Sequence, residues 1–303
     1  MIIANPLYDV VFKYLLEDIE IARELLSTIL NEPITHLEVK PQETVTEGSQ
    51  NNLNVLRFDF KATIETPAGE LKKVLIELQK LKQNFDIMRF RRYLGDNYKK
   101  EDDIPLGDGT ITKMPLPIVT IYILGFVLNK MTNAAVKVNR EYIDILTNQP
   151  ILVKEEFIEL LTHDSYVIQV LSLPPETKTK LERVLQIFNP KFKTRDRHKL
   201  DFTGNIDEPI VQKMVNRLQR AITDEEVRQI MDVEDEIERA FARATAAKDL
   251  VIAEQEQTIN EQEQVINEKE QVINEKEQEL EAEREKVALL MRQLADLQKQ
   301  NKT

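Results

Sequence analysis

Two short runs of alternating apolar and polar residues, at positions 57–64 and 73–79, constrain the fold of this chain most strongly. Their apolar members are Phe58, Phe60, Ala62 and Ile64 in the first run, and Val74, Ile76 and Leu78 in the second. A period of two predicts strands that bury one face. Because Pro67 and Gly69 lie between the runs, we expect an antiparallel hairpin that pairs Phe60 with Ile76.

The same register places Asp59 opposite Glu77, with Gln79 on the same face. Side chains paired across two strands lie roughly 4.5–5.5 Å apart, and like charges at that distance repel. A divalent cation removes the repulsion, since Mg²⁺ or Mn²⁺ binds carboxylates while keeping sites for water and phosphate oxygens. The hairpin therefore predicts a metal site at Asp59 and Glu77. Two strand carboxylates that simply face solvent are the plainer interpretation of the spacing alone.

The sequence around the hairpin resembles the PD-(D/E)XK nuclease superfamily over residues 5–205. The matching segments are NPLYDVVFKYLLEDIEIARELLSTILN, RFDFKATI, IELQK and MRFRRYLGDNY, in this order. They are similar to the branch of nuclease family transposases, which is related to recombination-promoting nucleases. The resemblance implies an α/β fold with a restriction-endonuclease-like core, a mixed central sheet flanked by helices. It also implies a Mg²⁺-dependent DNA endonuclease that hydrolyses phosphodiester bonds.

By this resemblance the catalytic residues are Asp59, Glu77 and Gln79, of which Asp59 and Glu77 hold the metal. Gln79 occupies a position that is usually a catalytic lysine, and glutamine supplies no positive charge to the transition state. Lys80 points to the opposite face of an ideal strand, and Lys82 lies further along the chain. Neither lysine is an evident substitute.

Helices are predicted on both sides of the hairpin. The helix at residues 85–100 is basic, and we expect Arg89 and Arg92 to contact substrate phosphates, although ion pairs with nearby acids would also account for them. One or two helices at residues 6–30 carry Glu20 and Glu24, either as a further metal ligand or as part of a solvated face.

The remaining pattern favours an α/β core. The nearly continuous apolar run at residues 116–128 is typical of a central strand that is covered on both faces. Further strands are expected at 34–39, 136–138 and 166–171, a helix at 177–187, and a turn-rich loop at 101–113.

Composition excludes several kinds of site. The chain has no cysteine, so disulfides and thiolate metal sites are excluded, and its three histidines are far apart in the sequence. No run reaches the ~18 apolar residues of a membrane span, and we expect a cytoplasmic protein without a membrane partner. The net charge is −12. Half of it falls after Val251, where the acidic and basic residues number 13 and 7, so the total says little about a local DNA-binding surface.

After Pro209 the sequence contains neither proline nor glycine, which predicts helices at 210–222 and 224–250 followed by a longer one. A strict sevenfold spacing then joins Ile252, Ile259, Ile266, Ile273, Leu280, Val287 and Leu294. This repeat predicts a coiled coil, hence a homo-oligomer. Polar residues fill most of the second seam position, so Val287, Leu290, Leu294 and Leu297 should anchor association.

The expected organisation is a nuclease-like domain at 1–205, a helical extension at 206–250 and a coiled coil at 251–303. The leading functional hypothesis is a DNA endonuclease. One alternative is a catalytically degenerate nuclease fold that binds DNA or protein as an oligomer. The other is a structural oligomer in which the carboxylate pair is incidental.

Overall fold

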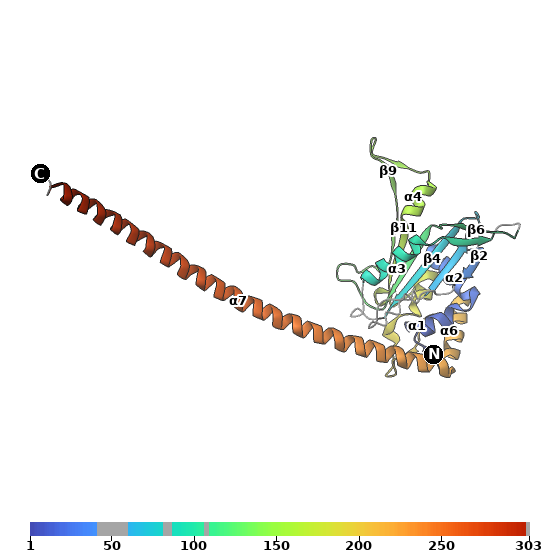
Figure 1. The fold of residues 1–303 in the computed structure, drawn as a ribbon. Coiled ribbons are helices and arrows are strands. Elements are labelled where there is room, and N and C mark those ends of the chain that lie inside the picture. The colour runs from blue at the N-terminus through green and yellow to red at the C-terminus, as the bar shows by residue number, and fades with distance from the viewer. Residues whose placement is uncertain (41–59, 81–86, 106–108, 301–303) are drawn as a thin grey trace. The chain divides into compact units, whose positions relative to one another are not determined.

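A mixed six-stranded sheet organises the first part of the chain (Figure 1). The fold is that of a computed structural model, which describes residues 1–40, 60–80, 87–105 and 109–300. The strand order is β2-β3-β4-β7-β11-β8, with β4, β7 and β11 parallel and the other neighbours antiparallel. The strands are β2 (His36–Val39), β3 (Phe60–Glu65), β4 (Leu71–Gln79), β7 (Ile118–Leu124), β8 (Ala135–Val138) and β11 (His163–Gln169).

The predicted hairpin is confirmed in its register for the described residues. Phe60 of β3 pairs with Ile76 of β4, and Ala62 pairs with Val74. The apolar run after position 116 is the central strand β7, which pairs with β4 on one side and β11 on the other. The chain is therefore a mixed α/β protein.

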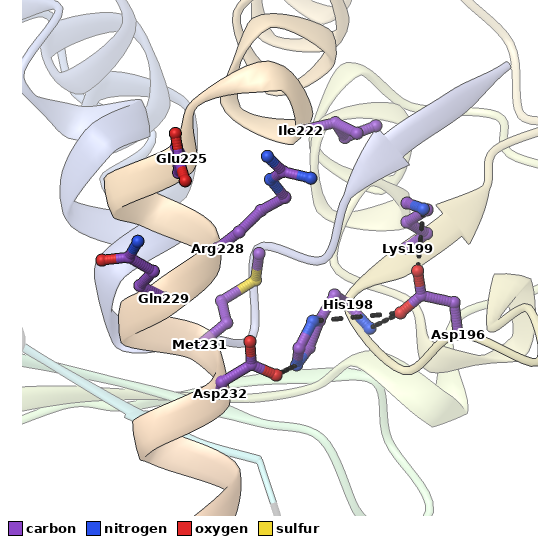
Figure 2. Close-up of a pocket in the computed structure, with 9 residues that line it drawn as sticks. All are labelled: Asp196, His198, Lys199, Ile222, Glu225, Arg228, Gln229, Met231 and Asp232. Atoms are coloured by element: carbon purple, nitrogen blue, oxygen red, sulfur yellow. Dashed lines mark hydrogen bonds and ion pairs between the residues drawn. The ribbon is translucent and has the colours of Figure 1, made fainter.

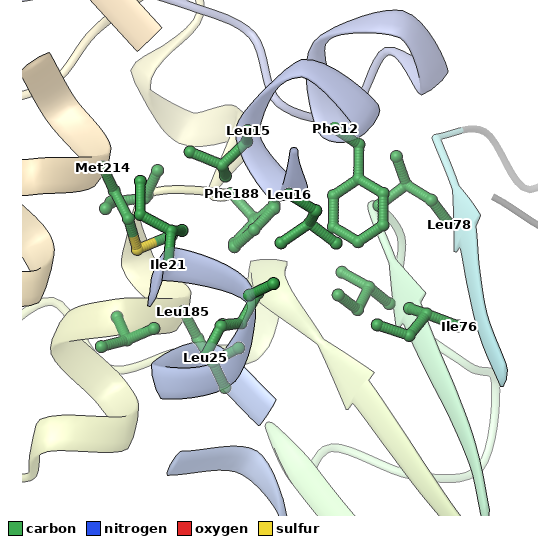
Figure 3. Packing of buried hydrophobic residues seen from close by; sticks show 14 of the residues in the cluster. Phe12, Leu15, Leu16, Ile21, Leu25, Ile76, Leu78, Leu185, Phe188 and Met214 are labelled. Atoms are coloured by element: carbon green, nitrogen blue, oxygen red, sulfur yellow. The ribbon is translucent and has the colours of Figure 1, made fainter. Parts of the chain in front are cut away.

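One face of the sheet forms the main hydrophobic core (Figure 3). Val74, Ile76 and Leu78 of β4 belong to it, together with the apolar sides of α1 and α2. Helical spacing of apolar residues directs these helices onto the sheet. The helices that contribute to this core are α1 (Asp9–Leu16), α2 (Ile19–Leu30), α5 (Lys180–Gln186), α6 (Pro209–Thr223) and the first turns of α7 (Glu225–Gln300).

Local signals explain where two of these helices begin and end. Asp18 caps α2 by accepting hydrogen bonds from the backbone N–H groups of Glu20 and Ile21, and Asn31 ends it in a left-handed conformation, φ 54°. Thr179 and Glu182 form a reciprocal capping box at the start of α5.

Several elements lie where no strand or helix was expected. The predicted loop at 101–113 contains β5 (Asp102–Pro105) and the start of β6 (Ile111–Met114), so that prediction was wrong; Asp102 pairs with Met114 and Pro105 with Ile111. Long-range pairing also joins β1 (Ile2–Ala4) to β12 (Lys199–Asp201). The other additional elements are β9 (Tyr142–Asp144), β10 (Gln149–Ile151), α4 (Glu156–Leu161) and the short 3₁₀ helices at Val170–Ser172 and Pro190–Phe192. By contrast, the helix α3 (Ile87–Lys99) was expected from the sequence.

Contacts divide the chain into two units, Met1–Arg239 and Ala240–Thr303. Val211, Met214 and Leu218 of α6 are buried in the main core of the first unit. In the second unit α7 continues as a helix to Gln300. Across the described ranges, every helix is either too polar or too short to cross a bilayer.

We expect alanine substitutions at Gly125 and at Gly95 to change the stability of the protein in opposite directions. A Cβ at Gly125 would lie 2.7 Å from the Lys80 backbone oxygen and 3.0 Å from Leu7 Cδ1, so Gly125→Ala must force β4 and the end of β7 apart. We expect a loss of about 1–3 kcal/mol in unfolding free energy. Gly95 lies inside α3, where an added Cβ would meet nothing within 4 Å, so Gly95→Ala should add about 0.5–1 kcal/mol. Urea unfolding of both variants checks the pair, and equal effects would contradict it.

Candidate active site

The candidate active site is the second face of the sheet, opposite the main core. Lys73, Leu75, Glu77 and Gln79 of β4 alternate with the core residues and therefore point to this face. Glu77 lies beside Tyr122 of β7 in the parallel register, and Gln79 lies beside Leu124. Both Glu77 and Gln79 are near the carboxyl end of β4, the edge at which open parallel sheets commonly bind ligands.

Helix α3 covers this face. Phe90 packs on Tyr122 with ring centroids 5.5 Å apart, and the Lys73 ammonium donates to the Asn97 backbone oxygen at 3.3 Å. Because Tyr122 is the register neighbour of Glu77, the first contact brings α3 over the predicted site. The Glu77 side chain is accordingly only 1% exposed and Gln79 5% exposed.

Polar side chains continue across the face onto the next strands. The Thr120 hydroxyl donates to Ser165 Oγ at 2.8 Å, and the Tyr98 hydroxyl of α3 hydrogen-bonds to His163 Nδ1 at 2.9 Å. Burial raises the pKa of Tyr122; the hydrogen bond with Thr120 opposes that shift, and the negative charge of Glu77 adds to it. Burial and the charge of Arg140 lower the pKa of His163.

A buried ion pair lies on the second face of the sheet, near the amino end of β4. The Lys73 ammonium lies 2.5 Å from Asp102 Oδ2, and their side chains are 1% and 5% exposed. A buried pair of this kind is costly to break from one side only. Asp102 and Asn97 therefore hold the Lys73 ammonium in place. Lys73 lies several residues before Glu77 along β4.

The predicted site residues are only partly within the described chain. Asp59 lies outside the described residues, and so does the side chain of Arg89. Arg92 is on the exposed side of α3, where its Nε donates to the Met88 backbone oxygen at 3.2 Å. Of the predicted catalytic residues, the structure thus brings Glu77 and Gln79 to one face.

Lys80 points to the other face of the sheet, as predicted. Its ammonium lies 3.2 Å from Asp235 Oδ1, 2.8 Å from Glu238 Oε1 and 3.5 Å from the centre of the Tyr8 ring. It therefore supplies no charge beside Gln79. Glu24 and Glu20 are also remote, since they pair with Lys180 and Lys213 on helices of the main-core side.

The donors at the predicted site suit a hard cation. The Glu77 carboxylate and the Gln79 amide oxygen are oxygen ligands of the type that Mg²⁺ and Mn²⁺ accept. Within the described ranges no three acidic or histidine side chains gather closely enough to hold a metal ion. The site at Asp59, Glu77 and Gln79 would thus depend on Asp59, which lies outside those ranges.

A second polar cluster, which the sequence analysis missed, lies within the first unit and includes Asp235 from the start of α7. The Tyr8 hydroxyl donates to Asp235 Oδ1 at 2.7 Å, and His198 Nε2 lies 3.3 Å from Asp235 Oδ2. Burial acts to raise the pKa of Asp235. The hydrogen bond from Tyr8 and the charge of Lys80 outweigh this effect and hold that pKa below its ordinary value. No local sequence motif predicts this cluster, because its four members come from segments that are far apart in the sequence.

A pocket of about 360 Å³ adjoins this cluster between the start of α7 and the segment before β12 (Figure 2). Its lining carries charges of both signs: Lys199 and Arg228 on one hand, and Asp196, Glu225 and Asp232 on the other. Lys199 pairs with Asp196 at 2.8 Å across the mouth. A lining of mixed sign selects neither an anion nor a cation, so the pocket is not assigned a ligand.

Comparisons of this chain with protein-family models, with characterised proteins and with solved structures found no match. The functional assignment therefore depends on the residues and their geometry.

Glu234 makes the docking of α7 depend on pH. Its two carboxylate oxygens accept the N–H groups of Asp9 and Val10 at 3.0 and 2.9 Å, at the start of α1. Burial raises the pKa of Glu234 from 4.5 to about 7, opposed by the hydrogen bond from Val10 and supported by the charge of Asp9. In this window the unfolded chain binds fewer protons than the folded one, so the contribution of Glu234 to stability falls as pH rises from about 4.5 to 7.

Glu234→Gln removes this titration. Between pH 5 and pH 8 we expect the native protein to lose about 1–3 kcal/mol relative to the Glu234→Gln variant. Thermal unfolding of the first unit, followed by near-ultraviolet circular dichroism, measures the difference. Glu236→Gln, at an exposed position of the same helix, is the matched control and should follow the native curve. Parallel curves for all three proteins would contradict the assignment.

Proposed function

We propose that this chain is a metal-dependent DNA endonuclease with a restriction-endonuclease-like core, of the transposase-like branch of the PD-(D/E)XK superfamily. The main support is the face of β4 that carries Glu77 and Gln79 at the carboxyl end of a parallel strand pair. The order of elements also agrees with that core: the helix α2, the antiparallel strands β2, β3 and β4, the helix α3 and the parallel strand β7.

In the proposed site Asp59 and Glu77 hold Mg²⁺ or Mn²⁺. A bound metal supplies an activated water at neutral pH and neutralises charge on the scissile phosphate. The Gln79 amide orients the water or a phosphate oxygen by hydrogen bonding. Arg92 and Arg89 of α3 contact the DNA backbone, which gives affinity without sequence preference.

Burial of Glu77 supports a second candidate function. Its side chain is 1% exposed beneath α3, and Gln79 provides no positive charge. A fold that binds DNA without cutting it would keep both features. Salt-sensitive DNA binding without metal-dependent turnover distinguishes this candidate.

Cleavage of supercoiled plasmid by the purified full chain tests the nuclease proposal. With Mg²⁺ or Mn²⁺ we expect cutting that falls by about a hundredfold or more in Glu77→Gln and in Asp59→Asn, because each removes metal-binding charge. Glu38→Gln is the control, since Glu38 lies on the exposed edge strand β2. Absence of cutting with either metal, or equal cutting by all four proteins, would overturn the proposal.

We further propose that α7 joins copies of the chain through its heptads. In the single chain the heptad residues from Ile252 to Val287 are 50–56% exposed, which is typical of a seam without its partner. Pairing two copies would bring two active sites to one DNA duplex.

Val287 and Leu290 test the anchoring end of this seam; they are 50% and 59% exposed. The double change Val287→Asp with Leu290→Asp should weaken self-association by about tenfold or more, because two apolar contacts become charged. Sedimentation equilibrium of the full chain measures the change. Gln262→Ala with Lys269→Ala, in the polar middle of the helix, should not weaken it. Association that is unaffected by the aspartates would place the contact elsewhere.

A further inference from the structure

The two core positions of the α7 heptads differ in polarity. Helix α7 is continuous from Glu225 to Gln300 (Figure 1), so the repeat is not interrupted. The first core position, a, is apolar in all seven heptads: Ile252, Ile259, Ile266, Ile273, Leu280, Val287 and Leu294. The second core position, d, is polar in the first five heptads and apolar in the last two: Gln255, Gln262, Lys269, Lys276, Glu283, Leu290 and Leu297.

This difference distinguishes the two orientations in which a second copy of α7 can pair with the first. In a parallel pair in register, a residues pack against the same a residues of the other helix, and d residues against the same d residues. All seven a layers are then apolar on both sides. The six a residues from Ile252 to Val287 are 50–56% exposed in the single chain, so this face has apolar surface to bury.

An antiparallel pair mixes the two positions, because a residues then pack against d residues. When the seven heptads overlap fully, Ile266 faces Glu283 of the partner subunit and Val287 faces Gln262 of the partner subunit. Five of the seven a residues face a glutamine, a lysine or a glutamate in this way. Each such layer removes water from a polar group without giving it a hydrogen-bond partner, which costs free energy.

The lysines at position d are compatible with the parallel orientation. In a parallel pair Lys269 and Lys276 each face their own copy, and like charges repel. Each lysine is followed at position e by a glutamate, Glu270 or Glu277. In a parallel coil the hole that receives a d side chain includes that e residue of the other helix. An ion pair across the interface can therefore offset the repulsion, and polar core positions of this kind specify the register.

Charges beside the core also favour the parallel orientation. In a parallel coil a residue at position g lies beside the e residue five positions later in the other helix, and ion pairs there set the orientation. Glu279 is at g and Arg284 is at the following e. Within one helix a separation of five residues is a rotation of about 140°, so these two side chains point apart. In a parallel pair they become neighbours twice, once on each side of the core.

We propose that α7 pairs with α7 of a second copy in parallel and in register. This inference rests on the proposed association through α7, to which it adds the orientation and the register, and it is independent of nuclease activity. Because each first unit precedes the heptads in the sequence, a parallel coil joins both first units at the same end. Two sites that act on one DNA duplex require such an arrangement.

Single cysteines test the orientation, since the chain contains none. In the full chain, Gln262→Cys and Glu283→Cys each place a thiol at position d without removing an apolar contact. Under mild oxidation each variant alone should form at least severalfold more disulfide-linked dimer than Gln264→Cys. Gln264 is a matched control because it lies two residues from Gln262 at the outward position f and is exposed.

The cysteine variants also separate this inference from the association on which it rests. In an antiparallel pair, Gln262→Cys would cross-link only when mixed with Val287→Cys, because these positions then face each other. That result would overturn the parallel orientation and leave the association standing. Cross-linking at the level of Gln264→Cys in every variant and mixture would overturn both.

A charge exchange tests the register. Arg284→Glu places like charges beside each other on both sides of the core and should weaken self-association of the full chain by about fivefold. Adding Glu279→Arg to this variant restores opposite charges and should restore the association. Glu285→Arg, at the outward position f, is the control and should change little. Sedimentation equilibrium measures all three variants, and failure of the second change to compensate the first would overturn the proposed register.

Discussion

The ladder that joins β4 to β3 and to β7 is the interaction on which the rest of the first unit depends. Backbone pairing joins Leu71–Ile76 of β4 to β3 and Lys73–Gln79 to β7, so β4 lies between two neighbours in the sheet. Ile76 and Leu78 bury one face under α1 and α2, while Glu77 and Gln79 point beneath α3. One strand therefore separates an apolar layer, which stabilises the fold, from a polar layer with the chemical groups of the candidate site.

Gly125 shows how tightly the end of this ladder is built. Its N–H donates to the Gln79 backbone oxygen at 2.8 Å, and the Lys80 carbonyl leaves no room for a Cβ. Lys80 directly follows β4 and pairs with Asp235 of α7. The backbone beside the candidate site is thus tied to the long helix through one residue, which gives the start of α7 a role in fixing the site and in closing the core.

The two polar layers differ in what they can do. On the α3 side, the Glu77 carboxylate, the Gln79 amide and the Thr120 hydroxyl lie on a covered face of the sheet. On the α7 side, Asp235 accepts hydrogen bonds from Tyr8 and Lys80, whereas the buried His198 Nε2 lies 3.3 Å from Asp235 Oδ2 without a hydrogen bond.

The sequence alone determined those structural elements that are encoded by a local, repeating pattern of apolar and polar residues. The alternation at positions 60–64 and 74–78 fixed the hairpin register, the apolar run after 116 fixed the central strand, and the heptads with no proline or glycine fixed the long helix. It also determined that Glu77 and Gln79 share a face and that Lys80 does not. Each of these follows from a period of 2 or 3.6 residues, which needs no distant partner.

Tertiary structure alone decided the contacts between distant segments. The pairing of Ile3 with Leu200, the Tyr8–Lys80–His198–Asp235 cluster, and the burial of Glu77 beneath α3 join residues that no local pattern relates. The β5–β6 strands escaped prediction because their short segments carry turn and charge signals typical of loops. A strand of three or four residues is defined by the segment of the chain with which it pairs. Only the folded molecule shows which segment that is.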